Sequence, residues 1–157
     1  MTADVPVTVP PPAANRRPRP LVVLAWVAQI VVAVILAQTL VFKFTYAPET
    51  RYIFEARGGR PAATLVGLAE LACVALLLIP RTAAVGALLS LGVIGGALFT
   101  HLTALGIQVM NPDTGEWDGG LLFGLAVAVA VGSLVVLAVR WKQLPFIGRI
   151  LPLGSSR

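Results

Sequence analysis

Four long apolar runs constrain the fold of this 157-residue chain more than any other feature of its sequence. The runs are residues 21–42, 61–80, 82–100 and 119–139. Together they hold 82 residues, and Glu70 is the only formally charged residue within them. A helix rises about 1.5 Å per residue, so about 20 residues cross a hydrocarbon core about 30 Å thick. Each run is therefore long enough to span a membrane.

The length of the runs favours helices over strands, although the runs are rich in Val. Buried strands are only about 4–8 residues long. A chain in lipid must also satisfy its backbone polar groups internally, as a helix does. We therefore expect an all-α fold, a transmembrane four-helix bundle within residues 21–142. The expected helices lie at about 21–46, 61–80, 82–103 and 119–140.

The composition excludes both a soluble domain and a disordered chain. Apolar residues make up 57% of the chain and charged residues 12%, whereas soluble domains are about 25% charged. Seven acids and twelve bases cannot cover four such helices with a polar surface. Disorder requires low hydrophobicity. The single cysteine, Cys73, excludes an internal disulfide, and within an apolar helix we expect its thiol to be inert.

A cleaved signal peptide is the alternative interpretation of the first run, because Arg16, Arg17 and Arg19 precede it. The run is 22 residues long, whereas the apolar region of a signal peptide has about 7–15 residues, and no cleavage site with two small residues follows. We therefore expect a retained helix. Residues 1–20 hold six of the twelve prolines and are expected to form a disordered cytoplasmic tail, with a second cytoplasmic tail at 143–157.

The distribution of Lys and Arg predicts the orientation in the membrane. With short connections the four helices are expected in up-down-up-down order. Eight bases then lie on the side of the two termini, and four lie on the side of the loops 43–60 and 102–118. Bases concentrate on the cytoplasmic side, so both termini are expected in the cytoplasm. The net charge of +5 is thus explained by topology and by contact with the lipid bilayer, and no nucleic-acid partner is expected.

Small residues four positions apart predict how the helices pack. Close helix approach in lipid depends on such residues, because apolar burial gives no net driving force there. The third and fourth runs carry such small residues. We expect these residues to pack the helices of one bundle against each other. Contact between copies in a homo-oligomer remains the alternative. The glycines in question are Gly92, Gly96, Gly120, Gly124 and Gly132.

Glu70 is the polar residue that most needs an explanation, because acids inside membrane helices are costly and usually face the bundle interior. A functional role and a structural role remain equally open. Lys43 and Thr39 lie four residues apart and so share a face of the first helix. Lys43 can reach Glu70 or extend to the head groups. His101 and Asp118 come at the same outer level, and the five residues form a candidate polar pocket.

The alternative interpretation of His101 is a residue at a helix end whose ring nitrogens are satisfied by ordinary hydrogen bonds. No dense set of ligands accompanies it, so no metal site is expected. The chain shows no pairing of a nucleophile with a base and no nucleotide-binding motif, and no catalytic residue is therefore assigned.

The sequence resembles the DoxX family over about residues 21–142. The resemblance is carried by Lys43 at the end of the first helix, by the segment around Glu70, and by the stretches 76–81, 99–102 and 118–120. It implies a small four-helix protein of a bacterial plasma (inner) membrane, with a Lys ending the first helix and an acid within the second. It also implies association with membrane redox or oxidative-stress systems.

Three functions remain open at this point. The first is an accessory subunit or scaffold of a membrane redox system, acting with a membrane or periplasmic oxidoreductase partner. The second is a quinone-binding component of an oxidoreductase, with Glu70 relaying a proton and a quinone as the cofactor. The third is a small transporter, which would more often show interrupted helices.

Overall fold

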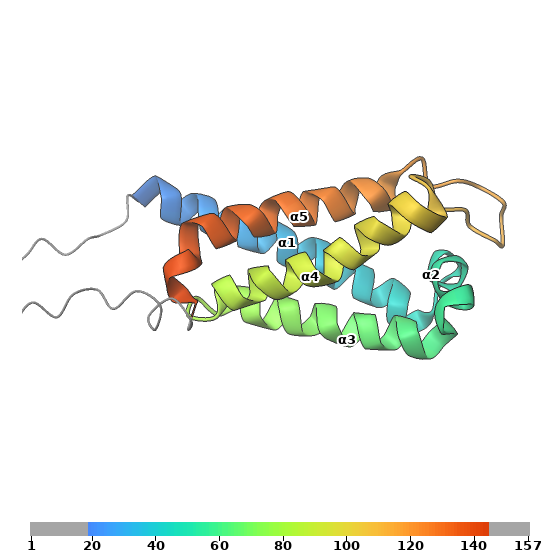
Figure 1. Ribbon diagram of the computed structural model, residues 1–157, viewed down its shortest axis with the longest axis horizontal. Coiled ribbons are helices and arrows are strands. Elements are labelled where there is room, and N and C mark those ends of the chain that lie inside the picture. The colour runs from blue at the N-terminus through green and yellow to red at the C-terminus, as the bar shows by residue number, and fades with distance from the viewer. Residues whose placement is uncertain (1–18, 145–157) are drawn as a thin grey trace, which may run out of the picture.

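Four long helices and one short helix make up the described part of the chain (Figure 1). The structure is a computed structural model that describes residues 19–144. The helices are α1 (Arg19–Thr45), α2 (Pro48–Phe54), α3 (Gly59–Leu78), α4 (Ala83–Thr100) and α5 (Leu121–Arg140). The short turns η1 (Glu55–Arg57), η2 (His101–Leu105) and η3 (Trp141–Gln143) follow α2, α4 and α5. Residues 19–144 contain no strand.

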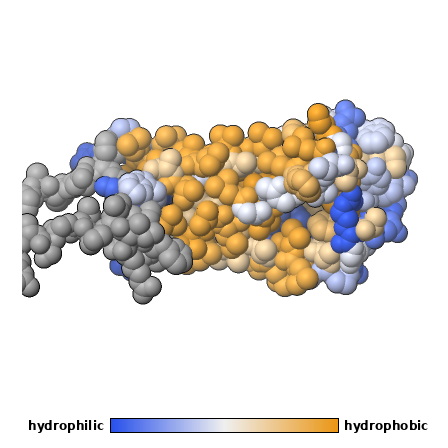
Figure 2. Space-filling view, viewed as in Figure 1, coloured by the Kyte–Doolittle hydropathy of each residue, from blue (hydrophilic) through white to orange (hydrophobic). Residues whose placement is uncertain are grey.

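The prediction of an all-helical protein with four potential membrane spans is confirmed. The spans are α1, α3, α4 with η2, and α5 with η3. Each has the length and apolar composition of a membrane-crossing helix. Figure 2 shows the corresponding surface, in which an apolar band lies between two hydrophilic ends. Large exposed apolar side chains on α1, such as Val23, Val27 and Val34, belong to this surface.

Backbone conformation explains where the helices begin and end. Tyr46 has φ +58° directly after α1, and Gly58 has φ +97° directly before α3. Gly119 and Gly120 also have positive φ, so α5 starts at Leu121 rather than at 119. Such φ values belong to the left-handed region and occur here at the ends of right-handed helices, including Gly59 (φ +60°), the first residue of α3.

The expected N-terminal tail differs from the structure, and Thr82 makes no side-chain cap of α4. Because α1 begins at Arg19, Arg19 and Pro20 belong to a helix, and the rest of that tail lies outside the described residues, as does 145–157. Thr82 directly precedes α4, at a position where Thr commonly caps a helix. Its hydroxyl instead donates to the carbonyl oxygens of Leu76 (2.9 Å) and Ile79 (3.2 Å), which satisfies the end of α3.

The long helices form a closed ring in which α1 and α4 each contact both α3 and α5. The α2 helix and the 106–120 connection lie at one end of the bundle, which we call the α2 end (Figure 1). The beginning of α1, the α3–α4 turn and the end of α5 lie at the other end. There Arg140 lies 5.4 Å from the ring of Trp26, and its Nη1 donates to the carbonyl oxygen of Pro80.

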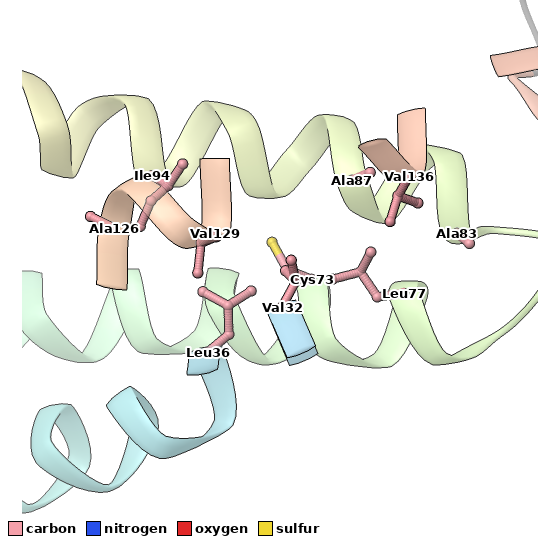
Figure 3. Close-up of a cluster of buried hydrophobic side chains, with 10 residues drawn as sticks. All are labelled: Val32, Leu36, Cys73, Leu77, Ala83, Ala87, Ile94, Ala126, Val129 and Val136. Carbon is pink, nitrogen blue, oxygen red and sulfur yellow. The ribbon is translucent and has the colours of Figure 1, made fainter. Parts of the chain in front are cut away.

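The core between the helices is built from small and branched apolar side chains, drawn in Figure 3. Its ten members are Val32, Leu36, Cys73, Leu77, Ala83, Ala87, Ile94, Ala126, Val129 and Val136. Gln29 is fully buried beside this cluster, and its amide donates to the carbonyl oxygen of Leu77. A buried amide bonded across two helices fixes their relative height, because the bond is lost if either helix slides.

The five glycines expected to close the bundle behave differently from one another. A Cβ on Gly132 would lie 2.5 Å from Val32, so α1 and α5 touch there. A Cβ on Gly120 would lie 3.2 Å from Ile107 in the preceding loop. A Cβ on Gly92, Gly96 or Gly124 would meet no atom within 4 Å. The internal packing expected of these last three is therefore absent, because their helix faces point away from the neighbouring helices.

Two glycines that the spacing pattern did not single out also make close approaches between helices. A Cβ on Gly86 of α4 would lie 2.7 Å from the backbone nitrogen of Leu77 on α3. A Cβ on Gly67 of α3 would lie 3.1 Å from the ring of Phe44 on α1. The first contact closes the α3–α4 pair near its turn, and the second brings α3 against the end of α1.

Candidate functional site

A cavity of about 400 Å³ lies at the α2 end and is lined by every helix and by the turns η1 and η2. Four of the five residues of the expected polar pocket line it: Thr39, Lys43, Glu70 and His101. Most of the remaining wall is apolar and includes Ile35, Val66, Val93, Ile94, Leu125 and Val129. A mainly apolar cavity with a few convergent polar groups is the usual form of a small-molecule site.

Lys43 and Glu70 form an ion pair in the cavity wall. The Lys43 Nζ atom donates to Oε1 and Oε2 of Glu70 at 2.9 Å and 2.8 Å. The Thr39 hydroxyl lies 3.0 Å from Oε2 of Glu70 and 2.8 Å from the carbonyl oxygen of Leu36. Only 5% of the Glu70 side chain and 14% of the Lys43 side chain are exposed. The carboxylate is thus held by two groups of α1, and its two oxygens have partners.

Gly67 explains why this pair can form. It lies three residues before Glu70, so both face the same neighbour, α1. A Cβ at Gly67 would lie 3.5 Å from the Cβ of Lys43, so the missing side chain lets the two backbones approach at this level. Of the two positions expected for Lys43, the structure shows contact with Glu70 rather than extension toward the head groups.

His101 lies on the opposite side of the bundle, at the start of the π-helical turn η2. Its Nδ1 lies 2.8 Å from the carbonyl oxygen of Gly106, and the Gly106 amide donates back to the His101 carbonyl oxygen at 2.8 Å. A carbonyl can only accept, so Nδ1 carries the proton and Nε2 of the neutral ring is an acceptor. The ring also meets Phe123 edge-on. The turn therefore fixes the tautomer and the position of the imidazole.

Asp118, the fifth expected pocket residue, does not line the cavity. Its Oδ1 accepts from the backbone N–H groups of Val109 and Gly120, and its Oδ2 accepts from that of Leu122. Burial alone would raise the pKa of Asp118, but these three backbone donors outweigh it and hold the pKa below its ordinary value. Asp118 thus caps the start of α5 and ties the preceding loop to it.

The α2 segment supplies cavity residues that sequence reasoning missed. Ile53 and Phe54 of α2 and Arg57 of η1 all line the cavity. Pro48 and the adjacent glycines Gly58 and Gly59 bound this segment in the sequence, a pattern typical of a short helix, and α2 with η1 occupies it. Nothing in that pattern indicated that the helix folds over the bundle, because a short loop helix has no spacing that identifies its partner.

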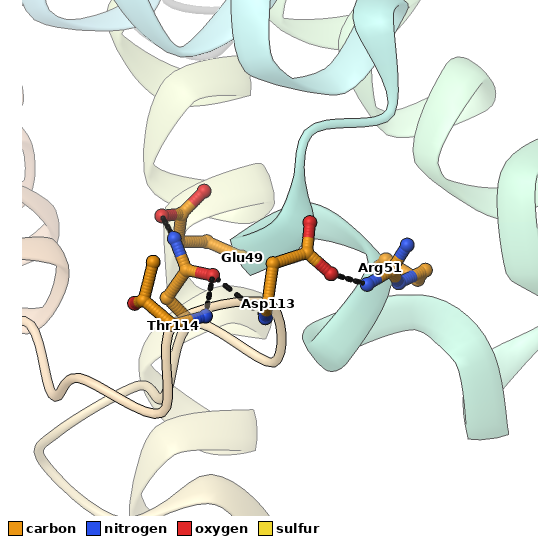
Figure 4. A network of polar contacts seen from close by, with 5 residues as sticks. Glu49, Arg51, Asp113 and Thr114 are labelled. Carbon is orange, nitrogen blue, oxygen red and sulfur yellow. Dashed lines mark hydrogen bonds and ion pairs between the residues drawn. The ribbon is translucent and has the colours of Figure 1, made fainter.

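The long loop before α5 holds α2 in place (Figure 4). Asn111 donates through its amide to Glu49 at 2.8 Å, and Arg51 forms an ion pair with Asp113. The Asn111 side chain also accepts from the backbone N–H groups of Asp113 and Thr114. These contacts join α2 to residues 111–114, and we call them the α2 latch.

No protein-family model, curated protein or solved structure matches this chain. The fold and the cavity define a class: an all-helical multi-pass membrane protein, with four helices long and apolar enough to span a membrane and a mainly apolar cavity at one end of the bundle. Among residues 19–144, no three His, Cys, Asp or Glu side chains gather closely enough to hold a metal ion. The polar side chains of the cavity wall are the Lys43–Glu70 ion pair, the hydroxyls of Thr39 and Thr100, the guanidinium of Arg57 and the imidazole of His101.

Proposed function

We propose that this chain is a DoxX-like protein of a bacterial plasma membrane, with helices in up-down-up-down order and both termini in the cytoplasm. The positive-inside rule supports this orientation, because basic residues gather at the end of the bundle opposite α2. Among them are Arg19, Arg81, Arg140 and Lys142. The α2 end then faces the outer side. A reporter fused after residue 115 should be active only outside the cytoplasm, and activity inside the cytoplasm would reverse the orientation.

We further propose that the cavity binds the head group of a membrane quinone. The observation that carries this proposal is the presence of a donor and an acceptor in the wall of one apolar cavity. An ammonium has three N–H groups, and Glu70 takes at most two of those of Lys43, which leaves one for a quinone carbonyl. The Nε2 atom of His101 can accept from a quinol hydroxyl. A flat apolar ring with oxygens at both ends matches this arrangement.

Glu70 has a positioning role in this proposal. The alternative, in which Glu70 relays a proton, requires the carboxylate to become neutral. That change would leave the largely buried Lys43 cation without its counter-charge, which is costly in a low-dielectric interior. We therefore assign direct contact with the ligand to Lys43 and His101, and assign to Glu70 the orientation of Lys43.

A photoreactive quinone with an isoprenoid tail tests the binding proposal. Labelling of the purified protein in lipid vesicles should map by mass spectrometry to cavity peptides of α1, α3 and α4. The Lys43→Met variant should lose most of the labelling. Lys142→Met removes a lysine beside Trp141 at the other end of the bundle and is the matched control. Equal labelling of both variants, or labelling outside the cavity, would refute the proposed site.

The proposed cellular role is that of an accessory subunit of a membrane redox system. The support is the resemblance carried by Lys43 and Glu70 and the absence of a metal-binding cluster or catalytic motif in residues 19–144. Affinity purification in mild detergent should recover a membrane or periplasmic oxidoreductase together with this chain. Recovery of the 16.4 kDa chain alone would count against the subunit role while leaving quinone binding intact.

A further inference from the structure

The cavity wall is exposed at two places. Of the residues that line it, Gly96 of α4 and Arg57 of η1 are exposed, and all the others are buried or half-buried. Gly96 also faces open space, because a Cβ there would meet no atom within 4 Å. Gly96 therefore lies at the opening of the cavity, because it lines the cavity, is exposed and has open space in front of it.

The opening lies between α3 and α4. These helices are pressed together near their connecting turn, where Gly86 meets the backbone of Leu77. From there α4 rises away from α3 toward the α2 end (Figure 1). On that side the lining comes from Val66 and Ala69 of α3 and from Gly96 and Thr100 of α4. We call this gap, bounded by Gly96 and Arg57, the lateral opening.

By contrast, α2 covers the route into the cavity along the bundle axis. Ile53 and Phe54 of α2 are half-buried and form part of the lining. The latch of Asn111 with Glu49 and of Arg51 with Asp113 holds α2 over the cavity (Figure 4). A ligand arriving from water would have to displace this segment, whereas one arriving from lipid meets a helix position without a side chain.

We propose that the ligand enters the cavity sideways from the outer leaflet, through the lateral opening, and that its isoprenoid tail leaves over Gly96 into the lipid. This inference rests on the quinone-binding function proposed above. It adds the route by which the quinone enters and the requirement that the quinone carries a lipid-soluble tail. The head group faces Lys43 and His101. Arg57 is exposed at the other edge of the opening, and its Nη1 donates to the carbonyl oxygen of Ile53 at 2.8 Å.

The experiment compares Gly96→Leu with Gly92→Leu in vesicles that contain the tailed photoreactive quinone. Both positions face open space on α4, but only Gly96 lines the cavity. We expect Gly96→Leu to slow labelling about tenfold or more, within the range over which association rates vary among variants of one site. Gly92→Leu should label at the wild-type rate, and circular dichroism with thermal unfolding should show that both variants fold.

A third variant separates the two routes. Asn111→Ala opens the latch without touching the cavity wall, so labelling should keep its wild-type rate if access is lateral. Faster labelling of Asn111→Ala, or unchanged labelling of Gly96→Leu, would overturn the lateral route and leave quinone binding standing. If the wild-type protein is not labelled at all, quinone binding fails, and the route fails with it.

Discussion

The Lys43 ammonium at the end of α1 lies 2.8 Å and 2.9 Å from the two carboxylate oxygens of Glu70 in the middle of α3. The single acid of the four apolar runs is thereby neutralised within the bundle. Because Gly67 sets the approach of the two helices, the pair also depends on one particular height of α1 against α3. The pair should therefore contribute both to stability and to the placement of the cavity wall.

Removing one partner of this pair should cost more than removing both. Glu70→Leu leaves the Lys43 charge without its partner in a largely buried position, which costs about 3–5 kcal/mol in other proteins. The double variant Lys43→Met/Glu70→Leu leaves no charge behind, and its loss should be smaller than that of Glu70→Leu alone. Denaturant unfolding in detergent micelles measures both. A double variant that loses the sum of the single losses would contradict a coupled pair.

Glycine substitutions should separate positions that touch a neighbour from positions that do not. Gly132→Ala drives a Cβ to 2.5 Å from Val32, and such overpacking costs about 1–3 kcal/mol. Gly124→Ala lies in open space on the same helix and should be neutral or stabilising by up to about 1 kcal/mol through helix propensity. Thermal unfolding gives the comparison. Adding Val32→Ala should restore much of the stability that Gly132→Ala loses. If stability does not recover, the loss does not come from the contact with Val32.

The spans of the bundle could be predicted from the sequence, because they depend on the length and apolar character of the runs. The Lys43–Glu70 pair was one of two alternatives for Lys43, and the sequence did not decide between them. The glycine contacts could not be predicted. In a membrane helix the side chains that face lipid and those that face the core are equally apolar, so spacing alone does not identify the packed face. Gly86 and Gly67 therefore gave no stronger signal than Gly92 or Gly96.

The bond of Asp118 to the preceding loop and the placement of α2 were also beyond sequence reasoning. A position just before the last apolar run predicts Asp118 as a cap of that helix, and its bonds to the backbone of 120 and 122 confirm this, whereas its bond to 109 depends on the path of the loop. The role of Arg57 depends in the same way on how α2 folds back over the bundle. Long-range loop conformation decides both, whereas helix periodicity decides neither.

A substitution at His101 should distinguish the structural role of Nδ1 from the proposed ligand-binding role of Nε2. An Asn amide can replace Nδ1 as the donor to the Gly106 carbonyl, so His101→Asn should keep the η2 turn while removing the acceptor at Nε2. Stability should fall by no more than about 1 kcal/mol, the net worth of a typical hydrogen bond. Quinone labelling should fall sharply. Wild-type labelling of His101→Asn would remove His101 from the ligand contacts, and isothermal titration with a short-tailed quinone gives an independent measure.

The two halves of the α2 latch should differ in strength. Arg51 and Asp113 are 40% and 54% exposed, and exposed ion pairs contribute about 0.2–1 kcal/mol, less at high salt. Asn111 bonds Glu49 and two backbone N–H groups, so Asn111→Ala should cost more than Asp113→Asn. Hydrogen exchange of the α2 amides measures each loss. Equal exchange in the two variants would show that the ion pair holds α2 as firmly as the Asn111 network does.

The start of α5 should lose protection in acid because of Asp118. The pKa of Asp118 is lowered in the folded protein, since three backbone donors outweigh its burial. An ordinary Asp has a pKa of about 3.9, so this contribution to stability is fully present above about pH 4 and disappears as the pH falls through the lower folded-state value. Exchange of the Val109, Gly120 and Leu122 amides should therefore accelerate only below about pH 4, beyond the intrinsic pH dependence of exchange. The Asp118→Asn variant should show weaker protection at neutral pH and no such transition. A transition that persists in Asp118→Asn would assign it to another carboxylate.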